Sequence, residues 1–84
     1  KILCVMRAFR DRNGRCWDAV VGRESYGIQV LLFLAEGSGE IRKAVMVSIT
    51  RLDAHRELDA LTDTELCERL DRSQPWDSDT LFPG

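Results

Sequence analysis

Few side chains in this sequence of 84 residues could do acid–base chemistry. His55 is the single histidine, and Asp53 and Glu57 stand two residues to either side of it. A carboxylate that orients a histidine can make it a general base. In so charged a stretch, however, a histidine is more often a solvated residue on a helix surface. We therefore expect no enzymatic activity, with one alternative: a cleft between two subunits that gathers His55 and Tyr26.

The three cysteines, Cys4, Cys16 and Cys67, are odd in number and far apart in the sequence. This spacing matches neither a disulfide framework nor a set of metal ligands. Gly37-Ser38-Gly39 precedes no helical pattern, so it predicts a hairpin turn and not a phosphate-binding loop. We therefore expect no metal and no cofactor. Unpaired cysteines favour a reducing, cytoplasmic location.

Arginines interleave with aromatic residues near the amino terminus, a pattern that suits nucleic acid because guanidinium groups bind phosphates and aromatic rings stack on bases. The candidate contacts are Arg7, Arg10, Arg12, Arg15 and Trp17. The isoelectric point of about 5.3 argues against a dedicated nucleic-acid-binding protein. The net charge is +4 over residues 1–23 and −5 over residues 50–84, so the arginines can also pair with the acidic part of the same chain.

The elements that would position these side chains begin with two apolar stretches around Asn13-Gly14. Asn-Gly is typical of a two-residue type I′ turn between antiparallel strands. Such a turn places Arg10 opposite Trp17 and Met6 opposite Val21. It predicts an inward face made of Met6, Ala8, Ala19 and Val21, with Arg10 over the Trp17 ring.

A second hairpin is predicted within residues 28–50, with a three-residue loop at 37–39. This loop would place Leu31 opposite Val45 and Gln29 opposite Val47. Residues 28–35 are apolar at nearly every position, which is typical of a strand that is covered on both faces.

The periodicity becomes helical after Thr50. Residues 51–60 read as a short helix with Ala54 and Leu58 facing inward. Thr62 and Glu65 form a capping box, which predicts a second helix from Asp63 to about Arg72 with Leu66, Cys67 and Leu70 on its buried side. Pro75 prevents continuation of that helix. We expect one small domain over residues 1–84, with an ordered core at about 6–73 and a tail at 74–84.

The predicted fold is α+β: a four-stranded antiparallel meander followed by one short and one capped helix packed on one face. A helix of ten residues is about 15 Å long and covers about half of such a face, so apolar surface of the second hairpin remains open. Either the sheet closes into a small barrel, or the open face meets a second copy. We favour a homodimer whose predicted face contains Leu31, Phe33, Val45 and Val47.

The sequence therefore favours a protein-interaction or regulatory module that works as a homodimer and that could also bind another protein. A nucleic-acid-binding accessory protein is the alternative. No apolar run is long enough to span a bilayer, so we expect no membrane association. Ten arginines against two lysines favour a bacterial source.

Overall fold

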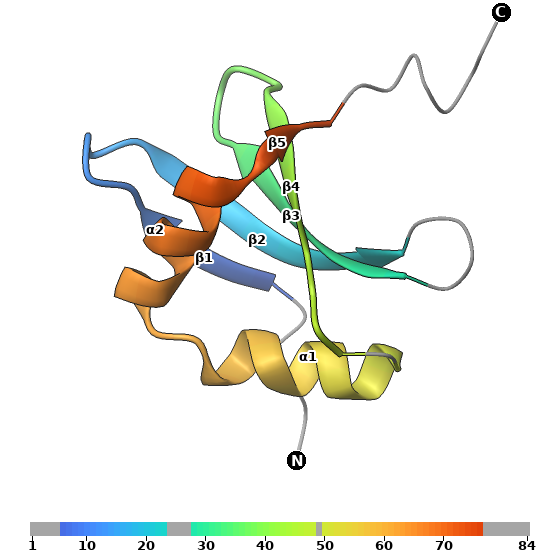
Figure 1. Cartoon of the computed structure of the whole chain (residues 1–84). Helices are drawn as coiled ribbons and strands as arrows, with labels where there is room; N and C mark the ends of the chain where they lie inside the picture. The colour runs from blue at the N-terminus through green and yellow to red at the C-terminus, as the bar shows by residue number, and fades with distance from the viewer. Residues whose placement is uncertain (1–5, 24–27, 49, 77–84) are drawn as a thin grey trace, which may run out of the picture.

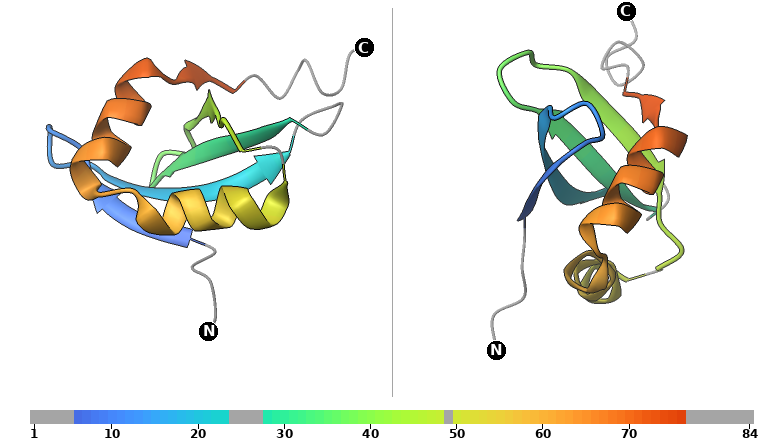
Figure 2. Two further views of the ribbon diagram at one scale, coloured as in Figure 1. Left: turned by 60° about the horizontal axis from the view of Figure 1, so that its bottom comes forward. Right: turned by 90° about the vertical axis from the view of Figure 1, so that its left-hand side faces the viewer.

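A computed structural model of the chain describes residues 6–23, 28–48 and 50–76 (Figure 1). The elements follow one another as β1 (Met6–Arg10), β2 (Cys16–Arg23), β3 (Gln29–Ala35), β4 (Ile41–Val45), α1 (Arg51–Ala60), α2 (Asp63–Arg72) and β5 (Gln74–Pro75). The predicted α+β class is confirmed: β1 to β4 form an antiparallel meander, and both helices lie on one side of the sheet (Figure 2).

A fifth, very short strand was not predicted. β5 pairs with Arg42 and Lys43 of β4, and the main-chain N–H of Trp76 donates to the Ile41 carbonyl at 2.9 Å. The first residues of the predicted tail therefore belong to the sheet, while residues 77–84 lie outside the described part of the chain. The strand order β1-β2-β3-β4-β5 leaves β1 and β5 at two separate edges. Over the residues that the structure describes, the sheet is open and not a closed barrel.

The predicted register of the first hairpin was wrong by one residue. Phe9 lies opposite Trp17, and Arg10 lies opposite Cys16. Because side chains alternate along a strand, this shift turns every residue of β1 to the other face. Phe9 is consequently buried, and Met6, which we expected in the core, is 52% exposed.

The physical reason for this shift is the carboxylate of Asp11. It accepts hydrogen bonds from the main-chain N–H groups of Asn13 and Arg15, each at 2.9 Å. The Gly14 N–H donates to the Asp11 carbonyl, and Gly14 has a φ of +84°. The loop therefore has three residues, with a turn followed by a left-handed glycine, and not the two residues of a type I′ turn.

The register of the second hairpin was also wrong by one residue. Leu31 lies opposite Ala44 and Val30 lies opposite Val45. The main-chain N–H of Ala35 donates to the Glu40 carbonyl at 2.9 Å, so the loop spans four residues, 36–39. Two of its residues, Gly37 and Gly39, have φ values of +84° and +75°, which only glycine adopts readily.

Both helices form over the residues that the sequence predicts. Thr50 caps α1, and Thr62 and Glu65 form the predicted capping box of α2. The core lies between the helices and the inner face of the sheet. It contains Phe9, Trp17, Ala19, Leu31, Phe33, Ala35, Met46, Ala54, Leu58, Leu61, Leu66 and Leu70. The rings of Phe9 and Phe33 meet edge to face at 5.8 Å between centroids, a favourable aromatic geometry.

Candidate interaction surfaces

The candidate nucleic-acid contacts of the first hairpin lie on different sides of the sheet. Arg7 points to the inner side, where its Nη1 donates to the carbonyls of Leu58 and Leu61 at 3.0 and 2.9 Å. These carbonyls lie at the end of α1, where the helix leaves carbonyl groups with spare accepting capacity, and that of Leu58 also accepts from the Leu61 N–H at 3.3 Å. The other terminal nitrogen of Arg7 pairs with Asp63 at 3.3 Å. Arg7 therefore holds the junction of α1 and α2 against β1.

The remaining candidates of the first hairpin also have partners within the subunit, with one exception. Arg12 pairs with Asp71 at 2.6 Å, and Arg15 pairs with Glu40 at 2.9 Å. Trp17 is buried, and Arg15, not Arg10 as predicted, lies over its ring at 4.9 Å from the centroid. Arg10 is exposed on the opposite face of the sheet. The structure thus does not bring the five candidates together on one surface.

The four residues of the predicted dimer face lie in two different places. Leu31 and Phe33 are fully buried in the core beneath the helices. Val45 and Val47 are 66% and 88% exposed. The one-residue register shift explains the separation, since it pairs Leu31 with Ala44 and turns Val45 to the far side of β4.

The outer face of the sheet, defined by the residues that alternate with the core, is largely apolar. The apolar members are Met6, Ala8, Val20, Val30, Leu32, Leu34, Ile41 and Val45, and the charged members are Arg10, Asp18 and Lys43. Both helices lie on the other side (Figure 2). No element among residues 6–23, 28–48 and 50–76 covers this outer face. Leu32, Leu34, Val20 and Ile41 are half-buried by their neighbours in the sheet.

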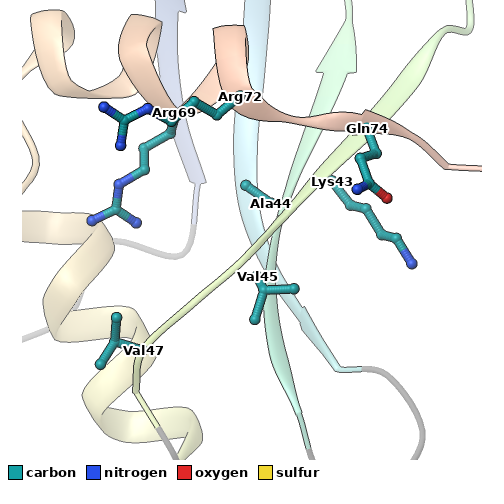
Figure 3. A pocket seen from close by; sticks show the side chains of 7 residues that line it. All are labelled: Lys43, Ala44, Val45, Val47, Arg69, Arg72 and Gln74. Carbon is teal, nitrogen blue, oxygen red and sulfur yellow. The ribbon is translucent and has the colours of Figure 1, made fainter.

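A groove of about 470 Å³ lies beside β4 (Figure 3). It is lined by Lys43, Ala44, Val45 and Val47 together with Arg69, Arg72 and Gln74. The two arginines come from the last turn of α2, where cations stabilise the helix dipole. Three of the seven lining residues are therefore cationic, and none is acidic. The sequence analysis missed this groove, because only the fold brings the end of α2 beside β4.

In the described part of the chain, the carboxylates beside His55 pair with other groups: Asp53 lies 4.0 Å from Arg56. His55 is half-buried, and its Nδ1 atom has no hydrogen-bond partner among the described residues. Glu57 instead accepts from Ser48 at 2.7 Å and from Arg69 at 3.0 Å. Tyr26 lies outside the described residues. A search of the described part of the chain found no cluster of three or more His, Cys, Asp or Glu side chains able to hold a metal ion.

Cys67 is the one cysteine with a distinctive environment in the described ranges. Its Sγ donates to the Arg10 carbonyl at 3.2 Å, and burial raises the pKa of its thiol above the ordinary value. A raised pKa lowers the thiolate fraction at neutral pH, which makes the side chain a poor nucleophile.

Comparison of the chain with family models, with curated proteins and with solved structures found no significant match. Among the described helices, none has the length and apolar character needed to cross a membrane.

Proposed function

We propose that this chain is a protein-interaction module that works as a homodimer, with the outer face of its sheet as the contact between the two copies. The observation that carries the proposal is the apolar outer face, which contains Met6 at 52% exposure and Val45 at 66% exposure. Monomeric proteins seldom leave a contiguous apolar patch of this kind open, and such patches mark interaction sites.

Size and shape support a modest rather than a tight dimer. A face of four strands by five residues spans about 19 Å by 17 Å, or about 320 Å² per protomer, which is below the size of stable interfaces and in the range of weak, transient ones. We therefore expect a dissociation constant in the micromolar range.

The charged residues of the outer face support a second copy of the chain as the partner that covers this face. A two-fold axis along β3 places β2 of one protomer over β4 of its partner. Asp18 lies on β2 and Lys43 on β4, both on the outer face and with opposite charges. The same axis therefore brings Asp18 of each protomer near Lys43 of the other, which makes the face complementary to itself.

Sedimentation velocity over a range of about 1 to 200 µM tests the proposal, because this range brackets a micromolar dissociation constant. We expect a monomer–dimer equilibrium that Leu34→Asp shifts to monomer, since the substitution places a charge within the apolar face. Leu52→Asp is the matched control, because Leu52 is 51% exposed on α1, away from the sheet. A monomeric wild-type chain throughout the range overturns the proposal.

A charge exchange tests the same contact without disturbing apolar packing. Asp18→Lys should weaken the dimer, and the double variant Asp18→Lys/Lys43→Asp should restore it. Failure of the double variant to restore association would count against the two-fold arrangement.

Nucleic-acid binding receives less support. Arg7, Arg12, Arg15 and Trp17 each contact groups of their own subunit. Partners of this kind compete with phosphates for the guanidinium groups. We propose no enzymatic activity, since among the described residues the carboxylates of Asp53 and Glu57 pair with groups other than His55.

A further inference from the structure

The edge of the sheet beside the groove is only partly paired. β5 pairs with β4 at Arg42 and Lys43, and among the described residues this pairing does not extend to Val45. Main-chain groups of an antiparallel strand point alternately to its two neighbours. Met46 N–H donates to the Gln29 carbonyl in β3, whereas the Ile41 carbonyl accepts from Trp76 on the opposite side. By this alternation the N–H and C=O of Val45 point away from β3, and no described strand lies opposite them.

The groove at this open end is basic. Lys43, Arg69 and Arg72 line it, and Gln74 adds an amide (Figure 3). Arg69 is paired with Glu57 at 3.0 Å, which neutralises much of its charge. The positive charge next to the exposed side chains of Val45 and Val47 therefore comes mainly from Arg72 and Lys43.

The charge pattern excludes the simplest occupant, a second copy of the same edge. Two β4 strands paired about a two-fold axis would bring Lys43, Arg69 and Arg72 of both copies together. Like charges brought together at an interface oppose association by several kcal/mol. An unpaired edge beside a cationic groove instead matches an extended segment with carboxylate side chains.

We propose that the open end of β4 binds an extended acidic segment of another protein as an added strand. The segment forms main-chain hydrogen bonds with Val45, packs its apolar side chains on Val45 and Val47, and places its carboxylates near Arg72. This inference rests on the proposed function in treating the chain as an interaction module. It uses the edge of the sheet, whereas the homodimer uses the face, and the two sites share Lys43 and Val45.

Two synthetic peptides of seven residues test the inference on the full chain. One alternates valine with glutamate, the other alternates valine with lysine, and both are blocked at their termini. The glutamate peptide should shift the amide resonances of residues 43–47 and 69–74 in an NMR titration, and the lysine peptide should not. Equal binding of both peptides, no binding of the glutamate peptide, or shifts confined to other regions would each overturn the inference.

Two arginine substitutions provide the matched comparison. Arg72→Glu should weaken binding of the glutamate peptide about tenfold at low salt, because it replaces an attraction with a repulsion. Arg56→Glu changes the charge by the same amount at an exposed position on α1 and should leave the affinity within about twofold. Similar affinities for the two variants would show general charge attraction and overturn the site.

The edge and the face are tested separately. The peptide titration is repeated on Leu34→Asp, which the proposed function expects to be monomeric. Peptide binding by this variant shows that the edge site works without the dimer. A wild-type chain that stays monomeric yet binds the glutamate peptide refutes the homodimer alone. A wild-type chain that dimerises, together with a monomeric Leu34→Asp variant that does not bind the peptide, refutes the edge site alone.

Discussion

The side chain of Leu32 occupies the space above Gly22 on the outer face of the sheet. A Cβ placed on Gly22 would lie 2.7 Å from Leu32 Cδ1 and 3.4 Å from Val30 Cγ2. The glycine therefore lets two aliphatic side chains of β3 lie flat across β2. This contact contributes to the burial of Val30, which is only 2% exposed.

The substitution Gly22→Ala should consequently alter the outer face more than the stability of the subunit. The methyl group forces the Leu32 side chain to another rotamer, at a cost of about 1 kcal/mol that the better strand propensity of alanine partly offsets. We expect the free energy of unfolding to change by less than about 1 kcal/mol. The dissociation constant of the dimer, measured by sedimentation velocity, should rise severalfold. An unchanged dimer would show that Leu32 is not part of the contact.

Arg7 is expected to be the most important arginine for stability. Its guanidinium donates to three carbonyls around the end of α1, those of Leu58, Asp59 and Leu61, and its side chain is only 23% exposed. Arg7→Lys keeps the charge but not the planar fork. We expect a loss of about 1–3 kcal/mol in the free energy of unfolding, measured with urea. Arg10→Lys, at an exposed position in the same strand, should change it by less than about 0.5 kcal/mol.

The carboxylate of Asp11 should make the first hairpin sensitive to acid. The hydrogen bond from Trp17 Nε1, 2.9 Å long, is the main cause that lowers the pKa of Asp11 below its ordinary 3.8, and the Arg15 main-chain N–H adds to it. Because the pKa is lower in the folded state, the stabilisation is complete above the unfolded value and disappears as the pH falls through the folded value.

The measurement for Asp11 is the free energy of unfolding between about pH 5 and pH 2. Asp11→Asn should lower stability at the upper end and reduce its pH dependence. Trp17→Phe removes the donor and keeps an aromatic ring, so it should remove part of the same pH dependence. If the two substitutions have additive effects on the pH dependence, the hydrogen bond is not its source.

The thiol of Cys67 should react slowly. Burial raises its pKa, so the thiolate fraction at pH 8 is smaller than that of a free cysteine. We expect iodoacetamide to modify Cys67 more slowly than a cysteine in an unstructured peptide, with the difference lost in urea. Mass spectrometry of the digested protein assigns the rate to this residue. A rate equal to that of the peptide would contradict the burial of the thiol.

Every helix and strand of this fold except β5 could be predicted from the sequence, whereas the registers of the two hairpins could not. The capping box at Thr62 and Glu65 is a local signal, since both partners lie within one helical turn. The first hairpin could form either a two-residue type I′ turn or a three-residue loop, and the Asn13-Gly14 pair does not indicate which of the two is more stable. The Asp11 side chain supplies two hydrogen bonds that stabilise a three-residue loop, and this loop turns Phe9 inward.

The candidate surfaces were harder to predict for a related reason. The predicted dimer face joined Leu31 to Val45, and a single-residue shift of register separated them. The groove depends on Arg72 and Lys43, which are 29 positions apart in the sequence and meet only after α2 has packed beside β4.

The hydrogen bonds from Arg7 to the end of α1 join residues that are 51 to 54 positions apart in the sequence. Such distant partners must find each other through a large loss of chain entropy, which slows folding relative to proteins with local contacts. During synthesis, the first strand emerges long before the carbonyls that will hold it. Until then the newly made hairpins carry their apolar residues in the open, so the growing chain is most vulnerable to aggregation just before its helices are complete.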